Sequence, residues 1–299
     1  MNGVTPQKYI RNLLQVYQSG KFLDAEKHAL NFTRQYPNHP IGWKIFGAIM
    51  SQLGKKNKAV SANKKAVKLS FKDAESHSNL GASLEQIGKS KEAQSSYKKA
   101  ISLKPDFVQA HYNLGINLQT QGKFNEAMIS YRNVLKFMPN NVYAHNNLGA
   151  TYKELNKYDE AEKEYRQAIS IKHNYVEAHN NLGNILQELG RLDEAEVSLK
   201  QAISLNSNYT EAHYNLAITY QEKGKIYQAI ESYNQAIILK PDFARAHSSL
   251  GVLFQEQGSL KKAELSCRKA IAYESEYATA HYNLGVVLQK IGKQSEAIK

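Results

Sequence analysis

An alanine recurs every 34 residues along the whole of this 299-residue chain. A fixed period of roughly 20 to 50 residues indicates an array of similar structural units rather than one or two globular domains. When this alanine is numbered 20, the units start at residues 6, 40, 74, 108, 142, 176, 210, 244 and 278, and the last unit is incomplete. The alanines are Ala25, Ala59, Ala93, Ala127, Ala161, Ala195, Ala229, Ala263 and Ala297.

Glycine and proline follow the same period. Of the 17 glycines, all but two lie at position 8 or position 15 of the unit, and all six prolines lie at position 32 or position 1. Apolar residues at positions 4, 7, 8 and 11, and again at 20, 24, 27 and 28, have the spacing of helices buried on one face. Each unit is therefore predicted to be an antiparallel helix pair, whose first helix ends at a left-handed glycine or, once, at Asn156.

The order His/Trp-x-x-Leu-Gly, then Gly at 15, Ala at 20, Tyr at 24, Ala at 27 and Pro at 32 resembles the tetratricopeptide repeat over residues 6–299. The resemblance implies an all-α solenoid, a right-handed superhelix whose first helices line a concave groove. More narrowly, segments such as AHNNLGNILQELGRLDEAE resemble the tetratricopeptide arm of protein O-GlcNAc transferase and its bacterial relatives. We expect one solenoid over residues 1–299.

The two ends of the array differ. A helix pair buries its apolar faces only against neighbouring repeats, so end repeats should be atypical. In the first repeat, Arg11, Asn12 and Leu13 replace the usual Asn, Leu and Gly, as expected of an N-terminal cap. No polar closing helix follows Ser295–Lys299. We expect the chain either to continue into a longer protein or to self-associate through an uncapped C-terminal edge.

Position 6 is the sharpest candidate for binding. Packing does not require asparagine there, and asparagine costs an exposed helix about 0.5 kcal/mol relative to alanine. A carboxamide can accept from and donate to a peptide unit at once, so a row of them could hold the main chain of an extended peptide. The resemblance also implies such a ladder, although duplication of a common consensus would copy it without selection. The residues are Asn79, Asn113, Asn147, Asn181, Asn215 and Asn283.

Position 5 on the same face carries Tyr112, Tyr214 and Tyr282, and position 12 carries five glutamines. We assign these tyrosines, with the asparagines, to the peptide-binding surface. Position 5 holds only one lysine, Lys44, so the clustered lysines that clamp a C-terminal carboxylate are missing and a chaperone-tail adaptor is disfavoured. The predicted partner is a protein or an extended peptide.

A column of seven histidines occupies position 4. Ligands of one zinc ion must lie about 2.0–2.1 Å from it, whereas adjacent repeats are about 8–10 Å apart. We therefore predict packed rings with one satisfied nitrogen, no metal site and no cofactor. Cys267, at the core position 24, is predicted to be a buried, inert thiol. The histidines are His77, His111, His145, His179, His213, His247 and His281.

The formal charge of the chain is +12, and residues 40–73 alone contribute +7, from eight lysines and one aspartate. Such a charge could attract nucleic acid or an anionic membrane. Most of these lysines fall on the second helix, hence the convex side, without interleaved aromatic residues. This pattern favours a solvated surface and disfavours a nucleic-acid partner.

No apolar run approaches the ~20 residues of a membrane span, and the N-terminus lacks the apolar core of a signal peptide, so we expect a cytoplasmic protein. Metal-protease, hydrolase and paired-cysteine motifs are absent from the sequence. We predict a non-enzymatic scaffold that binds extended peptides in an asparagine-lined groove. The alternative is the substrate-recruiting arm of a longer transferase, resembling O-GlcNAc transferase or carrying a sulfotransferase or oxygenase domain, with its catalytic domain outside this chain.

Overall fold

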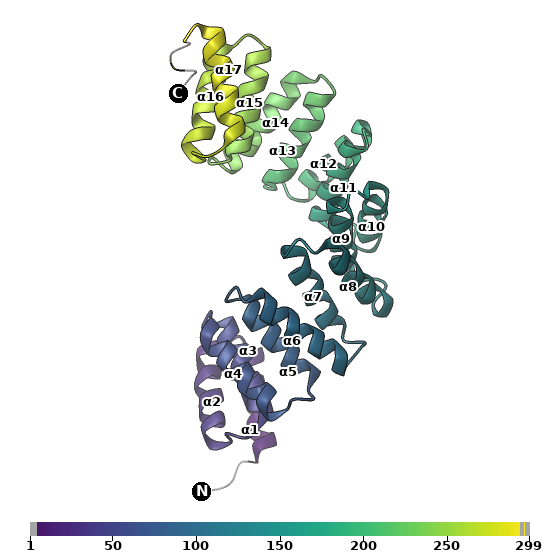
Figure 1. Cartoon of the computed structure of the whole chain (residues 1–299), viewed down its shortest axis with the longest axis vertical. Helices are drawn as coiled ribbons and strands as arrows, with labels where there is room; N and C mark the ends of the chain where they lie inside the picture. The colour runs from purple at the N-terminus through teal and green to yellow at the C-terminus, as the bar shows by residue number, and fades with distance from the viewer. Residues whose placement is uncertain (1–4, 294–295, 297–299) are drawn as a thin grey trace. The chain divides into compact units, whose positions relative to one another are not determined.

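The computed structural model describes residues 5–293 and residue 296, and these residues form helices and short turns without a strand (Figure 1). Ala297 and most of the predicted C-terminal edge lie outside the described residues. The chain divides into two compact units, an N-terminal unit of residues 1–155 and a C-terminal unit of residues 156–299. The all-α prediction is confirmed.

The N-terminal unit contains nine helices within its described residues. Each first helix packs against the second helix of its own repeat and the second helix against the next repeat, as the contacts of α3 with α4 and of α4 with α5 illustrate. The helices are α1 (Pro6–Gln18), α2 (Phe22–Gln35), α3 (Pro40–Gln52), α4 (Lys56–Leu69), α5 (Ala74–Glu85), α6 (Ser90–Leu103), α7 (Val108–Thr120), α8 (Phe124–Phe137) and α9 (Val142–Glu154).

The C-terminal unit is built in the same way. Its helices are α10 (Tyr158–Ile171), α11 (Val176–Glu188), α12 (Leu192–Leu205), α13 (Thr210–Glu222), α14 (Ile226–Leu239), α15 (Ala244–Glu256), α16 (Leu260–Tyr273) and α17 (Ala278–Ile291). In both units the odd-numbered helices begin at the residues where the period of 34 places the repeat starts. Whether the two units continue as one solenoid stays a prediction.

The turn between the paired helices requires a left-handed backbone conformation at position 15. The position-15 glycines have φ between +68° and +88°, and Asn156 has φ +55°. Asparagine tolerates the left-handed region better than most residues that carry a Cβ. The predicted turn is therefore confirmed at every position 15.

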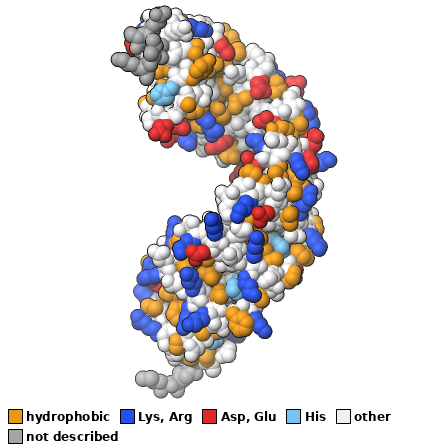
Figure 2. Space-filling model, viewed as in Figure 1, with side chains coloured by type: hydrophobic (Ala, Val, Ile, Leu, Met, Phe, Trp, Pro, Cys, Tyr) orange, Lys and Arg blue, Asp and Glu red, His pale blue; other side chains and the backbone are white. Residues whose placement is uncertain are grey.

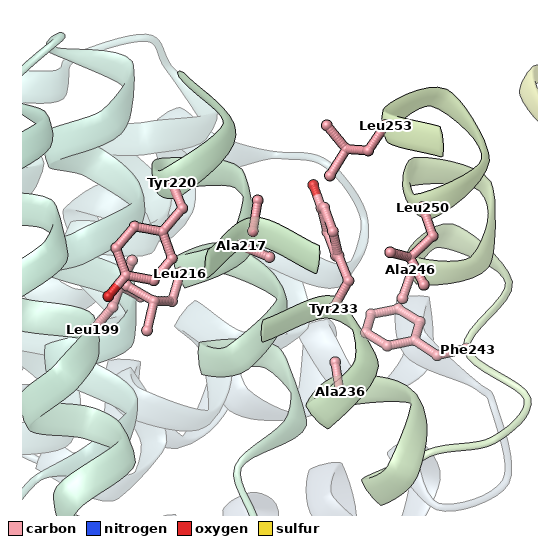
Figure 3. Close-up of a cluster of buried hydrophobic side chains, with 11 residues drawn as sticks. Leu199, Leu216, Ala217, Tyr220, Tyr233, Ala236, Phe243, Ala246, Leu250 and Leu253 are labelled. Carbon is pink, nitrogen blue, oxygen red and sulfur yellow. The ribbon is translucent and has the colours of Figure 1, made fainter. Parts of the chain in front are cut away.

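In the core, the glycine at position 8 packs directly against the side chain at position 24 of the same repeat. A Cβ added to Gly115 would lie 2.6 Å from the ring of Tyr131, so only glycine lets α7 approach α8 this closely. In the seventh repeat the glycine is replaced by Ala217, which lies in the same buried cluster as Tyr233. Figure 3 shows Tyr233 projecting from α14 between the helix of Ala217 and that of Leu250, in a cluster of buried side chains. The largest fully buried side chains of the described residues are thus Tyr97, Tyr131, Tyr165 and Tyr233, all at position 24.

Candidate functional site

The six predicted asparagines lie on first helices, and all six are half-buried. In the N-terminal unit they stand on α5, α7 and α9, and in the C-terminal unit on α11, α13 and α17. Successive first helices contact each other, α5 with α7 and α7 with α9, and likewise α11 with α13. Asn79, Asn113 and Asn147 are therefore carried by neighbouring first helices, as are Asn181 and Asn215. Asn283 is separated from them by α15, which carries Ser249 at position 6.

Three of these asparagines make the same bond to the preceding repeat. The Nδ2 of Asn147 donates to the hydroxyl of Tyr112 at 3.1 Å. In the C-terminal unit, Asn215 Nδ2 donates to Asn180 Oδ1 at 2.9 Å, and Asn283 Nδ2 donates to Ser248 Oγ at 3.1 Å. Each bond joins position 6 to position 5 of the repeat before it, 35 residues earlier. The asparagines therefore also fasten repeats together, a role that the sequence analysis missed.

The other three asparagines are held differently. Asn113 Oδ1 accepts from Gln109 Nε2 at 2.8 Å on the same helix, and its own N–H groups donate to no other described residue. Asn181 Oδ1 accepts from Asn180 Nδ2 at 3.5 Å. The carbonyl of Asn79 accepts from Ser83, while its side chain makes no hydrogen bond within the described residues. The number of hydrogen-bonding groups that remain for a ligand thus differs from one asparagine to the next.

The three predicted tyrosines have different surroundings. Burial raises the pKa of Tyr112, the bond from Asn147 opposes this, and neighbouring Tyr143 raises it further. Tyr214 packs against Phe243, with 5.0 Å between ring centroids, and the Arg245 guanidinium lies 5.6 Å from its ring centre. Tyr282 is 72% exposed on α17. Tyr112 and Tyr214 are therefore fixed by packing, and Tyr282 is open to solvent.

The glutamines at position 12 serve the packing of the repeats. Tyr131 donates its hydroxyl proton to Gln119 Oε1 at 2.9 Å, and Tyr233 does the same to Gln221 at 3.1 Å. Gln187 Nε2 donates to the carbonyl of Asn215 in the next repeat at 2.9 Å. Some of the glutamine amides that we expected in the groove are thus already hydrogen-bonded within or between repeats.

A pocket of about 470 Å³ lies beside Tyr112 in the N-terminal unit. It is formed where α7 and α9 begin, and two of its apolar side chains, Met138 and Tyr143, are about half exposed. The sequence analysis missed it, because the pocket joins residues from the boundaries of two successive repeats, Lys104–Tyr112 and Met138–Tyr143. It is lined by Lys104, Asp106, Phe107, Val108, Gln109, Tyr112, Met138, Asn141 and Tyr143.

The seven column histidines bond to the preceding loop. Each Nε2 lies 2.8–3.0 Å from the carbonyl oxygen six residues earlier. Trp43 Nε1 donates to the carbonyl of Pro37 in the same way, at 2.8 Å. Because a carbonyl only accepts, Nε2 of each histidine carries the proton. The prediction of one satisfied nitrogen is confirmed for all seven histidines, and six of the rings are buried or half-buried, whereas His281 is exposed. Burial lowers the pKa of His247.

Cys267 is buried beneath Gly251, where an added Cβ would lie 2.5 Å from its sulfur. Burial raises the pKa of this thiol to about 11. A thiol with so high a pKa is a poor nucleophile at neutral pH. The interpretation of Cys267 as an inert core residue is confirmed.

The family of the chain follows from a profile match. A model described as "TPR repeat" matches residues 85–122, 119–156, 151–190, 183–224 and 220–258, which together span more than half of the chain. The chain belongs to the tetratricopeptide repeat family. It is therefore an all-α repeat solenoid and a protein-interaction scaffold. None of its described helices is long and apolar enough to cross a membrane.

Solved structures give the same fold. The crystal structure of the APC/C hetero-tetramer Cut9–Hcn1 matches with a TM-score of 0.67 and 16% identity, over 96% of this chain and 57% of that chain. This chain thus spans little more than half of the matched chain, and at this identity the likeness concerns the fold alone.

Two smaller proteins are more similar in sequence. YrrB, described as a TPR protein with an unusual peptide-binding site, matches with a TM-score of 0.54 and 26% identity, over 63% of this chain and 97% of that chain. MamA matches with a TM-score of 0.50 and 32% identity, over 55% of this chain and 96% of that chain. No curated protein gives a significant match.

Proposed function

We propose that the scaffold binds extended peptide segments along its first helices, and that the position-6 asparagines hold the main chain of the ligand. The observation that carries the proposal is the 35-residue bond that fixes Asn147, Asn215 and Asn283. Each bond uses one of two N–H donors and sets the plane of the carboxamide. The second donor and the oxygen's remaining acceptor capacity stay available to a peptide.

Fixing a side chain before the ligand arrives lowers the entropic cost of binding. A bound side chain rich in rotamers otherwise costs about 0.5–1.5 kcal/mol to immobilise. A net hydrogen bond contributes a similar amount, so prior orientation decides whether each asparagine improves affinity. The description of YrrB, a relative of 26% identity, as having a peptide-binding site supports the same use of the fold.

The pocket beside Tyr112 adds selectivity to this main-chain contact. Its apolar wall can bury one side chain of the ligand, while the Tyr112 hydroxyl accepts from Asn147 at the pocket edge. Main-chain bonds and one side-chain pocket together resemble the general way in which extended peptides are recognised. We expect a ligand with an apolar residue at the place that meets this pocket.

The test uses one variant for each unit. One variant carries alanine at Asn79, Asn113 and Asn147, and the other at Asn181, Asn215 and Asn283. Each should bind peptides that were selected from a random library about tenfold or more weakly than the parent protein does. The matched control replaces Asn57, Asn125 and Asn234, which are exposed on second helices. Fluorescence anisotropy measures affinity, and circular dichroism checks that helicity is retained. Unchanged affinity in both test variants would refute the asparagine ladder.

The resemblance of the repeats to the O-GlcNAc transferase arm supports a second candidate function, recruitment of substrate for a catalytic domain outside these 299 residues. A transferase arm would use the same asparagines, so the peptide test applies to both functions. Reading the coding frame beyond Lys299 distinguishes the two functions, because only the arm requires a catalytic domain there.

A further inference from the structure

A stripe of four lysines covers the outer face of α4. Lys58 and Lys65 are seven residues apart, Lys64 and Lys68 four, and Lys65 and Lys68 three, which places the four lysines on one side of a helix. Lys58, Lys64 and Lys68 are exposed and Lys65 is half-buried. We call these four residues the basic stripe. None of them forms an ion pair within the described residues.

The basic stripe opposes the stability of its own helix. Lysines at (i, i+3) and (i, i+4) repel each other, and α4 contains no acidic residue to separate them. Lys58 also lies in the first turn, where the helix dipole disfavours a positive charge and where repeats three to six carry glutamate. A sequence that breaks local rules without a structural gain indicates a functional surface.

Acidic neighbours do not neutralise the basic stripe. Glu26 and Asp73, on either side of α4, are paired with Lys55 and Lys44. Glu92 of α6 lies close enough for Lys64 to lower its pKa, but its strongest interaction is the hydrogen bond from Lys89. Figure 2 shows Lys and Arg side chains, in blue, spread over the α1–α6 region with few acidic side chains between them.

An exposed phenylalanine lies just after the C-terminal end of α4. Phe71 stands at position 32, which is proline in four other repeats, and its side chain is 64% exposed. Its carbonyl is held by the Nε2 of His77 at 3.0 Å, so the loop is fixed while the ring contributes nothing to the core. Lys72 lies 5.7 Å from the ring centre. An aromatic ring beside lysines can enter the headgroup region of a bilayer.

We propose that the basic stripe and Phe71 bind an anionic lipid bilayer surface. A cluster of four to eight lysines on one helix face is the pattern that attracts acidic lipids. All eight basic residues of the second repeat are lysines, whereas arginine is preferred where phosphates are held in fixed geometry, as on nucleic acid. No aromatic residue interrupts the stripe to stack on bases. A fluid surface of dispersed charge fits these features better than a nucleic acid.

The test is flotation of the full chain with vesicles. We expect binding to phosphatidylcholine vesicles that contain phosphatidylserine, loss of binding at high salt, and none to pure phosphatidylcholine. Each lysine near an anionic surface strengthens partitioning about fivefold, so changing all four stripe lysines to glutamine should weaken it several hundredfold. Phe71→Ser should weaken partitioning severalfold at low salt, because the ring no longer enters the headgroup region.

The matched control removes the same charge elsewhere. Lys240, Lys261, Lys262 and Lys269 are exposed in the C-terminal unit without an ion pair in the described part of the chain, and their replacement by glutamine should change partitioning little. Equal losses in both variants would attribute the binding to net charge and overturn the proposal. Equal binding to pure phosphatidylcholine would also overturn it, as would tighter, stripe-dependent binding of a short RNA at the same salt. Circular dichroism of each variant confirms that it is folded.

Discussion

The two units share one core pattern but differ in charge. Residues 1–155 contain 22 lysines and arginines against 9 aspartates and glutamates, a formal charge of +13, whereas residues 156–299 contain 17 against 18, a charge of −1. In the C-terminal unit, ion pairs join successive second helices and their turns, such as Arg166 of α10 with Glu194 of α12 at 3.1 Å, and Glu162 of α10 with Arg191, just before α12, at 2.6 Å. The fold constrains the buried columns and leaves the outer surface free to diverge.

The largest expected effect tests whether the two cores are equivalent. Tyr131 and Tyr233 are both fully buried at position 24, with hydroxyls bonded to glutamines at position 12. Replacing either by alanine should destabilise its own unit by about 3–5 kcal/mol, because a large buried ring is lost. Native-state hydrogen exchange in urea measures this unit by unit. Tyr282→Ala, on an exposed ring, is the control, and a small loss at only one buried tyrosine would break the equivalence.

The second prediction concerns the close approach of paired helices. Gly115→Ala should destabilise the N-terminal unit by about 1–3 kcal/mol, because its Cβ would lie 2.6 Å from the ring of Tyr131. Ala217 occupies the same position in the C-terminal unit over Tyr233, so Ala217→Gly should cost only about 1 kcal/mol, through lower helix propensity. Thermal unfolding followed by circular dichroism compares the two. A Gly115→Ala protein as stable as the parent would show that α7 and α8 separate as easily as α13 and α14.

The third prediction applies to the C-terminal unit alone. Burial opposes ionisation of Glu196, but hydrogen bonds from Lys200, Lys223 and Lys225 outweigh it and lower its pKa to about 2. The contribution of Glu196 to the free energy of unfolding is therefore fully present above the unfolded pKa of ~4.5 and is lost as the pH falls through about 2. Glu196→Gln should cost about 1 kcal/mol at neutral pH and much less near pH 2, where the folded carboxyl is already about half protonated.

Urea unfolding of this variant across that pH range provides the measurement. Glu126→Gln is the matched control in the N-terminal unit, because its pair with Lys98 is long, at 3.9 Å, and about half exposed. A pH-independent loss in Glu196→Gln would mean that packing, not charge, holds Glu196.

The smallest expected effect is a difference in the sign of the salt response. Raising the ionic strength screens repulsion among the unpaired lysines of α4 and should increase amide protection there by a few tenths of a kcal/mol. The same salt weakens the exposed ion pairs of α10 and α12, so protection should fall by a similar amount. Hydrogen exchange of the intact chain at two salt concentrations measures both. Responses of the same sign would contradict the charge comparison.

Much of the fold could be predicted because its determinants are local. Glycines at position 15 and prolines at the boundaries specify where helices stop and start from short-range steric rules, and the helix starts coincide with the predicted repeat starts. One satisfied nitrogen in each column histidine was also predicted correctly, since the bond from Nε2 to the carbonyl six residues earlier is a local contact. These conclusions needed only the period and the chemistry of single residues.

The candidate site could be predicted only in part. The sequence located the asparagines on the first helices but not the bond from Asn147 to Tyr112, which depends on the offset between stacked repeats. The pocket beside Tyr112 was missed for the same reason, since Met138 and Tyr143 belong to a different repeat boundary from Phe107. Side-chain partners across layers follow from tertiary geometry that a linear pattern does not contain.

The asparagine bond between repeats has a direction. Asn147, Asn215 and Asn283 each reach back toward the N-terminus, so every such carboxamide depends on the repeat before it and none on the repeat after it. Shortening the array from its C-terminal end would leave the remaining carboxamides anchored. Shortening it from the N-terminal end through the repeat that carries Tyr112 would release Asn147, so the array is polar, and its two ends are not interchangeable as starting points for truncation or fusion.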